Sequence, residues 1–293
     1  MVTLFVFYFF SKIMTERLLI KALSGGKNTK IITLNGKKIT KMPSALGKLP
    51  GLKTLALQNN LIPKVCPELC NLTQLTTLNL GNNLLEEVPE EMKYLVSLKN
   101  LHLAGNRICR FAPGACDGLQ NLILLNLNNN HLTQLPQEVS RLKSLTHMSI
   151  NFNQLASIPR ELCFLKNLSE LQLNYNQLKC IPEEIKFLKK LQKLLLARNN
   201  IGVLPKELCD LKKLRILDIA GNIIRIFPSG VSAHLWDLGL FSHFGYCCYE
   251  RGYTNICSLL SVPLGTYSDK IVESYGNSMF NFLKNHHSVS KNV

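Results

Sequence analysis

The segment Leu75-Thr-Thr-Leu78-Asn-Leu80-Gly-Asn-Asn83 is one copy of the phrase Leu-x-x-Leu-x-Leu-x-x-Asn, which recurs along most of the chain. Its last asparagine returns every 23 residues, with one 24-residue step, at Asn60, Asn83, Asn106, Asn130, Asn153, Asn176, Asn199 and Asn222. A fixed period of this length indicates a solenoid, because a single repeat cannot bury its apolar face without a neighbour. We therefore predict an α/β solenoid of about nine repeats, with a curved parallel sheet on the concave side and short helices or 3-10 turns on the convex side.

Each repeat contains the signals for one strand and one turn. The Leu-x-Leu portion, as in Leu78 and Leu80, alternates apolar and polar residues and predicts a short strand with one buried face. The closing asparagine carries both donor and acceptor groups, so its stacked copies can form a structural ladder that satisfies buried backbone groups. Prolines such as Pro159 and Pro182 are followed by acidic residues, which is typical of the first positions of a helical turn.

The repeats divide the chain into four expected segments. They occupy residues 27–231, and the first copy is degenerate, with Lys37 in place of the asparagine, as is typical of a terminal repeat. Residues 14–26 have the amphipathic pattern of a helix that could cap this first repeat. Residues 232–293 lack the leucine phrase, and we expect this tail to be poorly ordered.

Residues 1–13 form an apolar extension at the N-terminus. The run of about ten apolar residues is half of what a bilayer span requires. No basic residue precedes it, and no small-residue cleavage site follows, so it is a poor secretory signal. Three interpretations remain open: an extension with no folded role, which we favour, a weakly membrane-seeking segment, and a signal peptide.

Charge and cysteine content bear on partners and on the cellular compartment. The formal net charge is +15, and much of the excess is lysine at helix and loop positions of the C-terminal half. A solvated outer face is the usual meaning, and binding to nucleic acid or another anionic surface is the alternative. Cys70, Cys163 and Cys209 recur at one repeat position in coils too far apart to bridge. We predict reduced thiols and a cytoplasmic location, although triplets beginning at Asn71 and Asn167 match the glycosylation signal.

Signatures of catalysis are missing from the sequence. We find no nucleophile with a partner base, no Gly-x-Gly-x-x-Gly and no phosphate-binding loop. The segment Cys66-Pro-Glu-Leu-Cys70 lacks the second ligand pair of a zinc site. We therefore expect a protein that is not an enzyme and uses neither a cofactor nor a metal.

The concave sheet is the candidate binding surface, because outward residues of successive strands line up in columns. A third column, just past the strands, contains Phe152, Tyr175 and Arg198, and aromatic residues and arginine dominate binding energies at interfaces. Outward strand positions are polar in any solvated sheet, so the pattern alone does not prove a site. The predicted partner-binding residues are Asn79, Asn100, His102, Asn126, His147, Phe152, Glu170, Gln172, Tyr175, Lys193 and Arg198.

The 23-residue phrase ending in Leu-Pro-x-x-Leu-x-x-Leu resembles the intracellular class of leucine-rich repeats found in Ras-pathway scaffolds and in Scribble- and Erbin-type proteins. The resemblance covers residues 28–228 and specifies fold far better than function. It implies a scaffold or adaptor that binds a protein partner, with a place in intracellular signalling. Three alternatives stay open: a membrane or receptor-type protein, a binder of nucleic acid or anionic surfaces through the basic C-terminal half, and a form made unstable and functionally silent by its tail.

Overall fold

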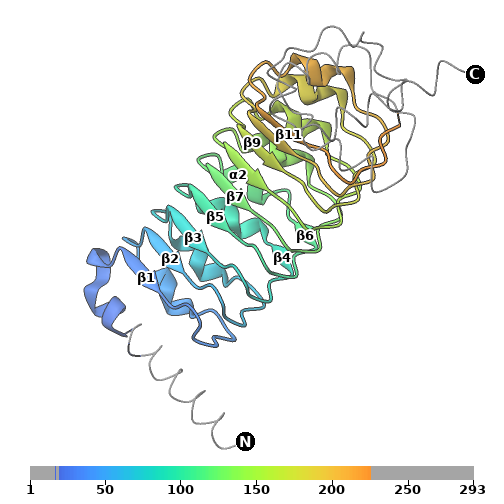
Figure 1. Ribbon diagram of the computed structural model, residues 1–293. Helices are drawn as coiled ribbons and strands as arrows, with labels where there is room; N and C mark the ends of the chain where they lie inside the picture. Colours follow the sequence, from blue (N-terminus) through green and yellow to red (C-terminus); the bar gives the residue numbers. More distant parts are fainter. Residues whose placement is uncertain (1–16, 18–19, 226–293) are drawn as a thin grey trace, which may run out of the picture.

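The computed structural model describes residue 17 and residues 20–225 of the chain. Nine short parallel strands follow one another in chain order along a curved stack, which confirms the predicted solenoid and its repeat number (Figure 1). Turns of helix lie on the opposite side of the stack from this sheet. The strands are β1 (Ile31–Thr33), β2 (Thr54–Ala56), β3 (Thr77–Asn79), β5 (Asn100–His102), β7 (Leu124–Asn126), β8 (His147–Ser149), β9 (Glu170–Gln172), β10 (Lys193–Leu195) and β11 (Ile216–Asp218).

The register of the sheet follows the sequence period. Leu78 pairs with Leu101 at the 23-residue spacing, whereas Leu101 pairs with Leu125 across the longer step. The extra residue is absorbed in α2 (Ala115–Gly118), the one convex turn of the described coils that is α-helical. A Cβ on Gly118 would lie 1.5 Å from the carbonyl oxygen of Lys93, so only glycine fits where this turn crosses the preceding coil.

The other convex turns are 3-10 helices of five residues each, and a shorter 3-10 turn of three residues precedes the first strand. In most of these five-residue turns proline is the N-cap residue in extended conformation, and not the first helical residue that the sequence pattern predicts. The proline carbonyl accepts the first hydrogen bond of the turn, as in Leu162 N to Pro159 O at 3.0 Å. The turns are η1 (Gly26–Asn28), η2 (Ser44–Lys48), η3 (Pro67–Asn71), η4 (Glu90–Tyr94), η5 (Gln137–Arg141), η6 (Arg160–Phe164), η7 (Glu183–Phe187) and η8 (Lys206–Asp210). A second, two-stranded parallel sheet joins β4 (Glu87–Val88) to β6 (Arg110–Phe111).

The leucines of all the coils form one continuous buried core, and the asparagine ladder runs through it. Asn83 shows the shared geometry: its Nδ2 donates to the carbonyls of Leu57 and Leu80, both at 3.0 Å, and its Oδ1 accepts from the backbone N–H of Ile62 at 3.0 Å. The other seven ladder asparagines make the same three kinds of bond. Each side chain therefore ties two coils together through groups that would otherwise be buried unpaired.

The two ends of the stack are described only in part. Residues 20–25 are α-helical, and Ala22 and Leu23 pack against the core. Thr29 Oγ1 donates to the Ala22 carbonyl at 2.7 Å, which fixes this helix to the first coil. The predicted extension 1–13, most of the first half of the segment 14–26, the last residues of the repeat region and the tail 232–293 lie outside the described residues.

Candidate protein-binding surface

The parallel register places the predicted concave residues side by side. His147, Glu170 and Lys193 are direct neighbours on β8, β9 and β10. Asn79, His102 and Asn126 are direct neighbours on β3, β5 and β7. Leu124 stands between Asn100 and His147 in their column. The predicted set therefore falls into an N-terminal and a C-terminal group.

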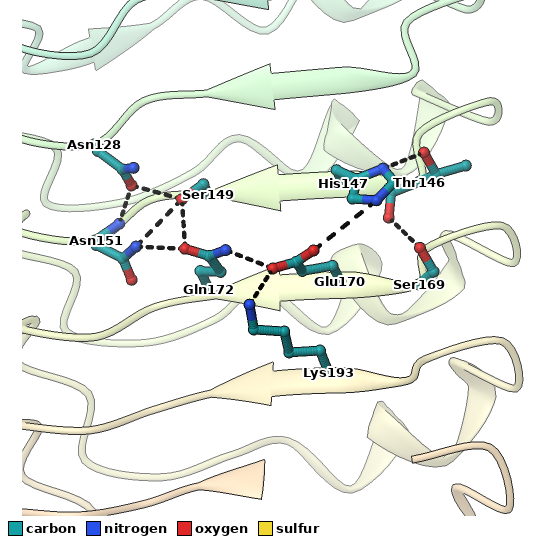
Figure 2. A network of polar contacts seen from close by, with 9 residues as sticks. All are labelled: Asn128, Thr146, His147, Ser149, Asn151, Ser169, Glu170, Gln172 and Lys193. Atoms are coloured by element: carbon teal, nitrogen blue, oxygen red, sulfur yellow. Dashed lines mark hydrogen bonds and ion pairs between the residues drawn. The ribbon is translucent and has the colours of Figure 1, made fainter. Parts of the chain in front are cut away.

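Glu170 is the centre of the C-terminal group (Figure 2). Lys193 Nζ lies 2.7 Å from its Oε1, and Gln172 Nε2 donates to the same oxygen at 2.6 Å. Partial burial alone would raise the pKa of the carboxyl group, but the hydrogen bonds from Lys193 and Gln172 and the charge of Lys193 outweigh it and lower that pKa. Glu170 is therefore a carboxylate at neutral pH, held in one orientation by its neighbours.

His147 faces Glu170 from the adjacent strand. Its Nε2 lies 3.9 Å from Glu170 Oε2, and its Nδ1 lies 2.7 Å from the Thr146 hydroxyl (Figure 2). The Thr146 hydroxyl also lies 3.1 Å from the Ile123 carbonyl, so it links the ring to the backbone of the preceding coil. His147 and Glu170 therefore form a contact between adjacent strands on the concave sheet.

A second asparagine ladder borders the group, and sequence reasoning missed it. Asn128 Oδ1 accepts from the backbone N–H of Asn151 at 2.7 Å, and Asn151 Oδ1 accepts from that of Asn174 at 2.8 Å. Asn174 Oδ1 continues the series with Ala197 N at 2.7 Å. The signal lies in the spacing, because these asparagines recur at 23 residues, each two positions before a ladder asparagine. The hydrogen bonds fix the backbone immediately before the third column.

Phe152, Tyr175 and Arg198 share an unusual backbone conformation. Their φ angles are 56°, 55° and 57°, in the left-handed region. Equivalent residues of the other coils, from the second to the ninth, are asparagine or glycine, which adopt this conformation readily: Asn59, Asn82, Gly105, Asn129 and Gly221. A bulky side chain costs about 1–2 kcal/mol at such a position. Three successive coils thus carry bulky side chains where the backbone disfavours them.

The structure brings two of these three side chains together as a ring pair. The rings of Phe152 and Tyr175 stack with centroids 4.3 Å apart and 13° between their planes. Each residue is about half exposed, 49% for Phe152 and 48% for Tyr175. Arg198 follows on the next coil and lies over Gly221, whose Cβ, if present, would be 2.7 Å from Arg198 Cδ.

The asparagine side chains of the N-terminal group form hydrogen bonds with neighbouring residues of the solenoid. Asn79 accepts from Gly81 N at 3.0 Å, Asn100 donates to Thr77 Oγ1 at 3.3 Å, and Asn126 accepts from Asn128 N at 3.1 Å. His102 is half-buried, and this burial lowers the pKa of its ring. Asn79, Asn100 and His102 lie on the far side of β7 from the network in Figure 2.

Reactive groups are poorly represented in the described coils. The seven cysteines there are free thiols, and burial raises the pKa of Cys70, Cys116 and Cys163 to about 12, which keeps them protonated. Within residue 17 and residues 20–225, no three His, Cys, Asp or Glu side chains are placed to hold a metal ion. None of the helices in that part of the chain is long and apolar enough to cross a bilayer.

Comparison with known proteins places these coils in a family. The sequence profile described as leucine rich repeat matches residues 50–108, 96–155, 143–201 and 166–224, which together cover more than half of the chain. The chain belongs to the leucine-rich repeat family. Leucine-rich repeat proteins are generally binding modules rather than enzymes, which agrees with the concave surface described above.

Two curated leucine-rich repeat proteins are similar to part of the chain. Leucine-rich repeat-containing protein 69 of Homo sapiens is 95% identical over 136 residues, and that of Mus musculus is 78% identical over 136 residues. In both cases the matched region covers 46% of this chain and 39% of the relative. The chain thus matches about two fifths of the length of these relatives.

Solved leucine-rich repeat structures superpose on the solenoid. A protein of Leptospira interrogans is 31% identical with a TM-score of 0.54, covering 70% of this chain and 64% of that one. The ectodomain of the Arabidopsis thaliana receptor kinase GASSHO1/SCHENGEN3, solved with CASPARIAN STRIP INTEGRITY FACTOR 2, is 30% identical with a TM-score of 0.59. The match covers 66% of this chain and 24% of that one. The plant peptide hormone receptor RGFR1, solved with RGF2, is 27% identical with a TM-score of 0.55. The match covers 66% of this chain and 36% of that one.

Proposed function

We propose that this protein is a non-enzymatic scaffold or adaptor that binds a protein partner on the C-terminal half of its concave surface. The observation that carries the proposal is the exposed stack of Phe152 and Tyr175 in a left-handed backbone. Residues in such disfavoured conformations persist only where the surrounding structure holds them in place. They cluster at functional sites. Asparagine adopts this backbone conformation more readily and occupies the position in other coils, so backbone conformation does not explain the aromatic side chains.

The neighbouring polar network suits recognition of a polypeptide. The carboxylate of Glu170 and the ammonium of Lys193 are fixed on adjacent strands within reach of the same partner. Charges held in this way give specificity and register, while the exposed rings supply apolar area that a partner can bury. Two of the similar structures were solved with bound factors, and one of these is a peptide hormone receptor. These complexes support the proposal that a protein of this fold binds a polypeptide partner.

The cellular setting is part of the proposal. The resemblance to the intracellular class of repeats and the free thiols of the described coils support a cytoplasmic location and a role in signalling. The triplet at Asn167 gives little support to the receptor-type alternative. Its Nδ2, the atom that a glycan would use, donates to the Lys143 carbonyl at 2.9 Å, and its Oδ1 accepts from Lys190 at 2.7 Å.

Capture of partner proteins from cells that express the tagged protein tests the proposal. The tagged full chain is compared with a variant in which Phe152, Tyr175 and Arg198 are all replaced by asparagine, the residue that equivalent coils tolerate. We expect proteins captured by the wild type to be lost from the triple variant. The control replaces Tyr94, Arg107 and Val203, which are also exposed, by asparagine and should keep them. The same captured proteins with all three forms would show that the concave site is wrong.

A further inference from the structure

The convex side carries a second exposed aromatic pair, which the proposed function does not use. Phe164 ends η6 and Phe187 ends η7, and their rings stack with centroids 5.4 Å apart and 26° between planes. The two residues are 45% and 41% exposed. Single exposed phenylalanines are ordinary, but two that meet on adjacent coils form a continuous apolar patch on a solvated face.

A column of lysines runs beside this pair. Lys143, Lys166, Lys189 and Lys212 occupy one position in four successive coils, two residues after the ends of η5 to η8, and all four are exposed. Lys190 and Lys213 directly follow the last two. None of the five ion pairs within the described residues uses any of these six lysines. The side therefore carries a concentrated positive charge.

Acidic residues of the same coils lie mostly at the other end of each turn. Within the first turn of η6, η7 and η8 lie Glu161, Glu183, Glu184 and Glu207, whereas the phenylalanines and the lysine column come at and after the turn ends. Asp210 is the one acid of these three turns at a turn end, in the coil after Phe187. Lys212 Nζ donates to the Cys209 carbonyl at 2.9 Å. Most acidic residues of these turns thus lie away from the phenylalanine pair and the lysine column.

We propose that the Phe164–Phe187 pair and the lysine column form a docking surface for the anionic face of a lipid bilayer. Lysines near such a face are attracted to phosphate and carboxylate headgroups, and apolar rings lying in the interface add burial. The convex side lies opposite the concave sheet, so a docked protein would keep its concave surface free for a partner (Figure 1). This inference does not depend on the proposed function.

The ring geometry favours a bilayer over single-stranded nucleic acid. Proteins that bind single strands stack bases on open aromatic faces. Here the inner faces of Phe164 and Phe187 cover each other, and Lys186 Nζ lies 5.6 Å from the centre of the Phe187 ring. The stacking removes one face of each ring from contact with a base, whereas burial in an apolar interface does not require an open ring face.

Sedimentation of the full chain with lipid vesicles tests the inference. We expect binding to vesicles of phosphatidylcholine with roughly one-third phosphatidylserine, and weak binding to pure phosphatidylcholine, since each lysine near an anionic surface strengthens binding about fivefold. Raising the salt concentration should weaken the binding, because salt screens the exposed charges. Equal binding to both vesicle types, or to neither, would overturn the proposal.

Matched variants assign the effect to these residues. Lys143→Gln/Lys166→Gln/Lys189→Gln/Lys212→Gln should reduce binding by more than about a hundredfold, and Phe164→Asn/Phe187→Asn should also weaken it. The control Lys41→Gln/Lys53→Gln/Lys64→Gln/Lys99→Gln removes the same charge from exposed positions elsewhere and should retain most of the binding. Asn71 already occupies the equivalent turn position in η3, so asparagine at Phe164 and Phe187 is compatible with the fold.

Two outcomes of the variant series would contradict the proposal. Similar losses in the control and in the lysine-column variant would mean that net charge alone drives binding. Binding of a labelled oligouridine that is abolished by Phe164→Asn/Phe187→Asn would identify nucleic acid as the ligand of this face. Thermal unfolding of every variant is measured alongside. Should the quadruple column variant unfold early, Lys166→Gln/Lys189→Gln with its own two-lysine control, Lys53→Gln/Lys99→Gln, decides the same question.

Discussion

The rings of Phe152 and Tyr175 stack 4.3 Å apart, although both residues have positive φ angles that phenylalanine and tyrosine rarely adopt. The stack offsets part of this conformational cost, since aromatic pairs contribute about 0.5–1.5 kcal/mol beyond their burial. Arg198 has the same backbone strain and takes no part in a ring stack. The three residues therefore differ in what their replacement should do to stability.

Replacing Arg198 by asparagine should stabilise the protein. The substitution relieves about 0.5–1 kcal/mol of left-handed strain. Phe152→Asn/Tyr175→Asn should change the free energy of unfolding little, because lost stacking offsets the relief. Urea unfolding of the variants measures both effects. A destabilised Arg198→Asn would mean that the arginine makes a stabilising contact stronger than the strain.

Removing a rung from either asparagine ladder should be costly, and more so in the inner ladder. Asn153→Ala leaves Leu132 N and the carbonyl of Leu127 without their side-chain partner, both within the core, which we expect to cost about 3 kcal/mol or more. Asn151→Ala removes the acceptor for one backbone N–H at the concave edge and should cost about 1–2 kcal/mol. Equal losses in urea unfolding would contradict this ranking.

The one-residue insertion in α2 should make Gly118 irreplaceable. In Gly118→Ala the new methyl group would collide with the Lys93 carbonyl, and we expect a loss of about 2–4 kcal/mol. Gly202→Ala is the control, because nothing lies within 4 Å of the place that its methyl group would take and its φ is ordinary. A similar midpoint of thermal unfolding for the two variants would show that the coil can shift to make room.

The lowered pKa of Glu170 predicts a pH dependence of stability. Since its folded-state pKa lies below the ordinary value of 4.5, the ionised carboxylate stabilises the fold above that pH. The contribution is lost as the pH falls through the folded-state pKa. Glu170→Gln should therefore unfold more easily than the wild type at neutral pH, with the difference shrinking in acid. A constant difference between about pH 6 and pH 3 would show that Lys193 and Gln172 do not stabilise the charge.

Much of the fold could be predicted because each repeat contains the sequence signals for its own strand and turn. Leu78 and Leu80 alternate as a strand residue pair must, and Asn83 follows where the chain turns, so the stack is determined once the period is known. The first residue of each turn was harder to predict from the sequence, since proline is compatible with both the N-cap and the first helical position. Asn128, Asn151 and Asn174 were overlooked because one position in a polar loop does not reveal where its amide points.

The sequence by itself determined that this protein is a leucine-rich repeat solenoid and which residues share each column, because a constant period places equivalent residues on neighbouring coils. Only the tertiary structure decided how those columns behave. Phe152 and Tyr175 meet as a stack, and so do Phe164 and Phe187, each pair lying 23 residues apart in the chain. Contacts of this kind depend on the backbone angles and side-chain directions of adjacent coils, which the packing of the whole stack sets.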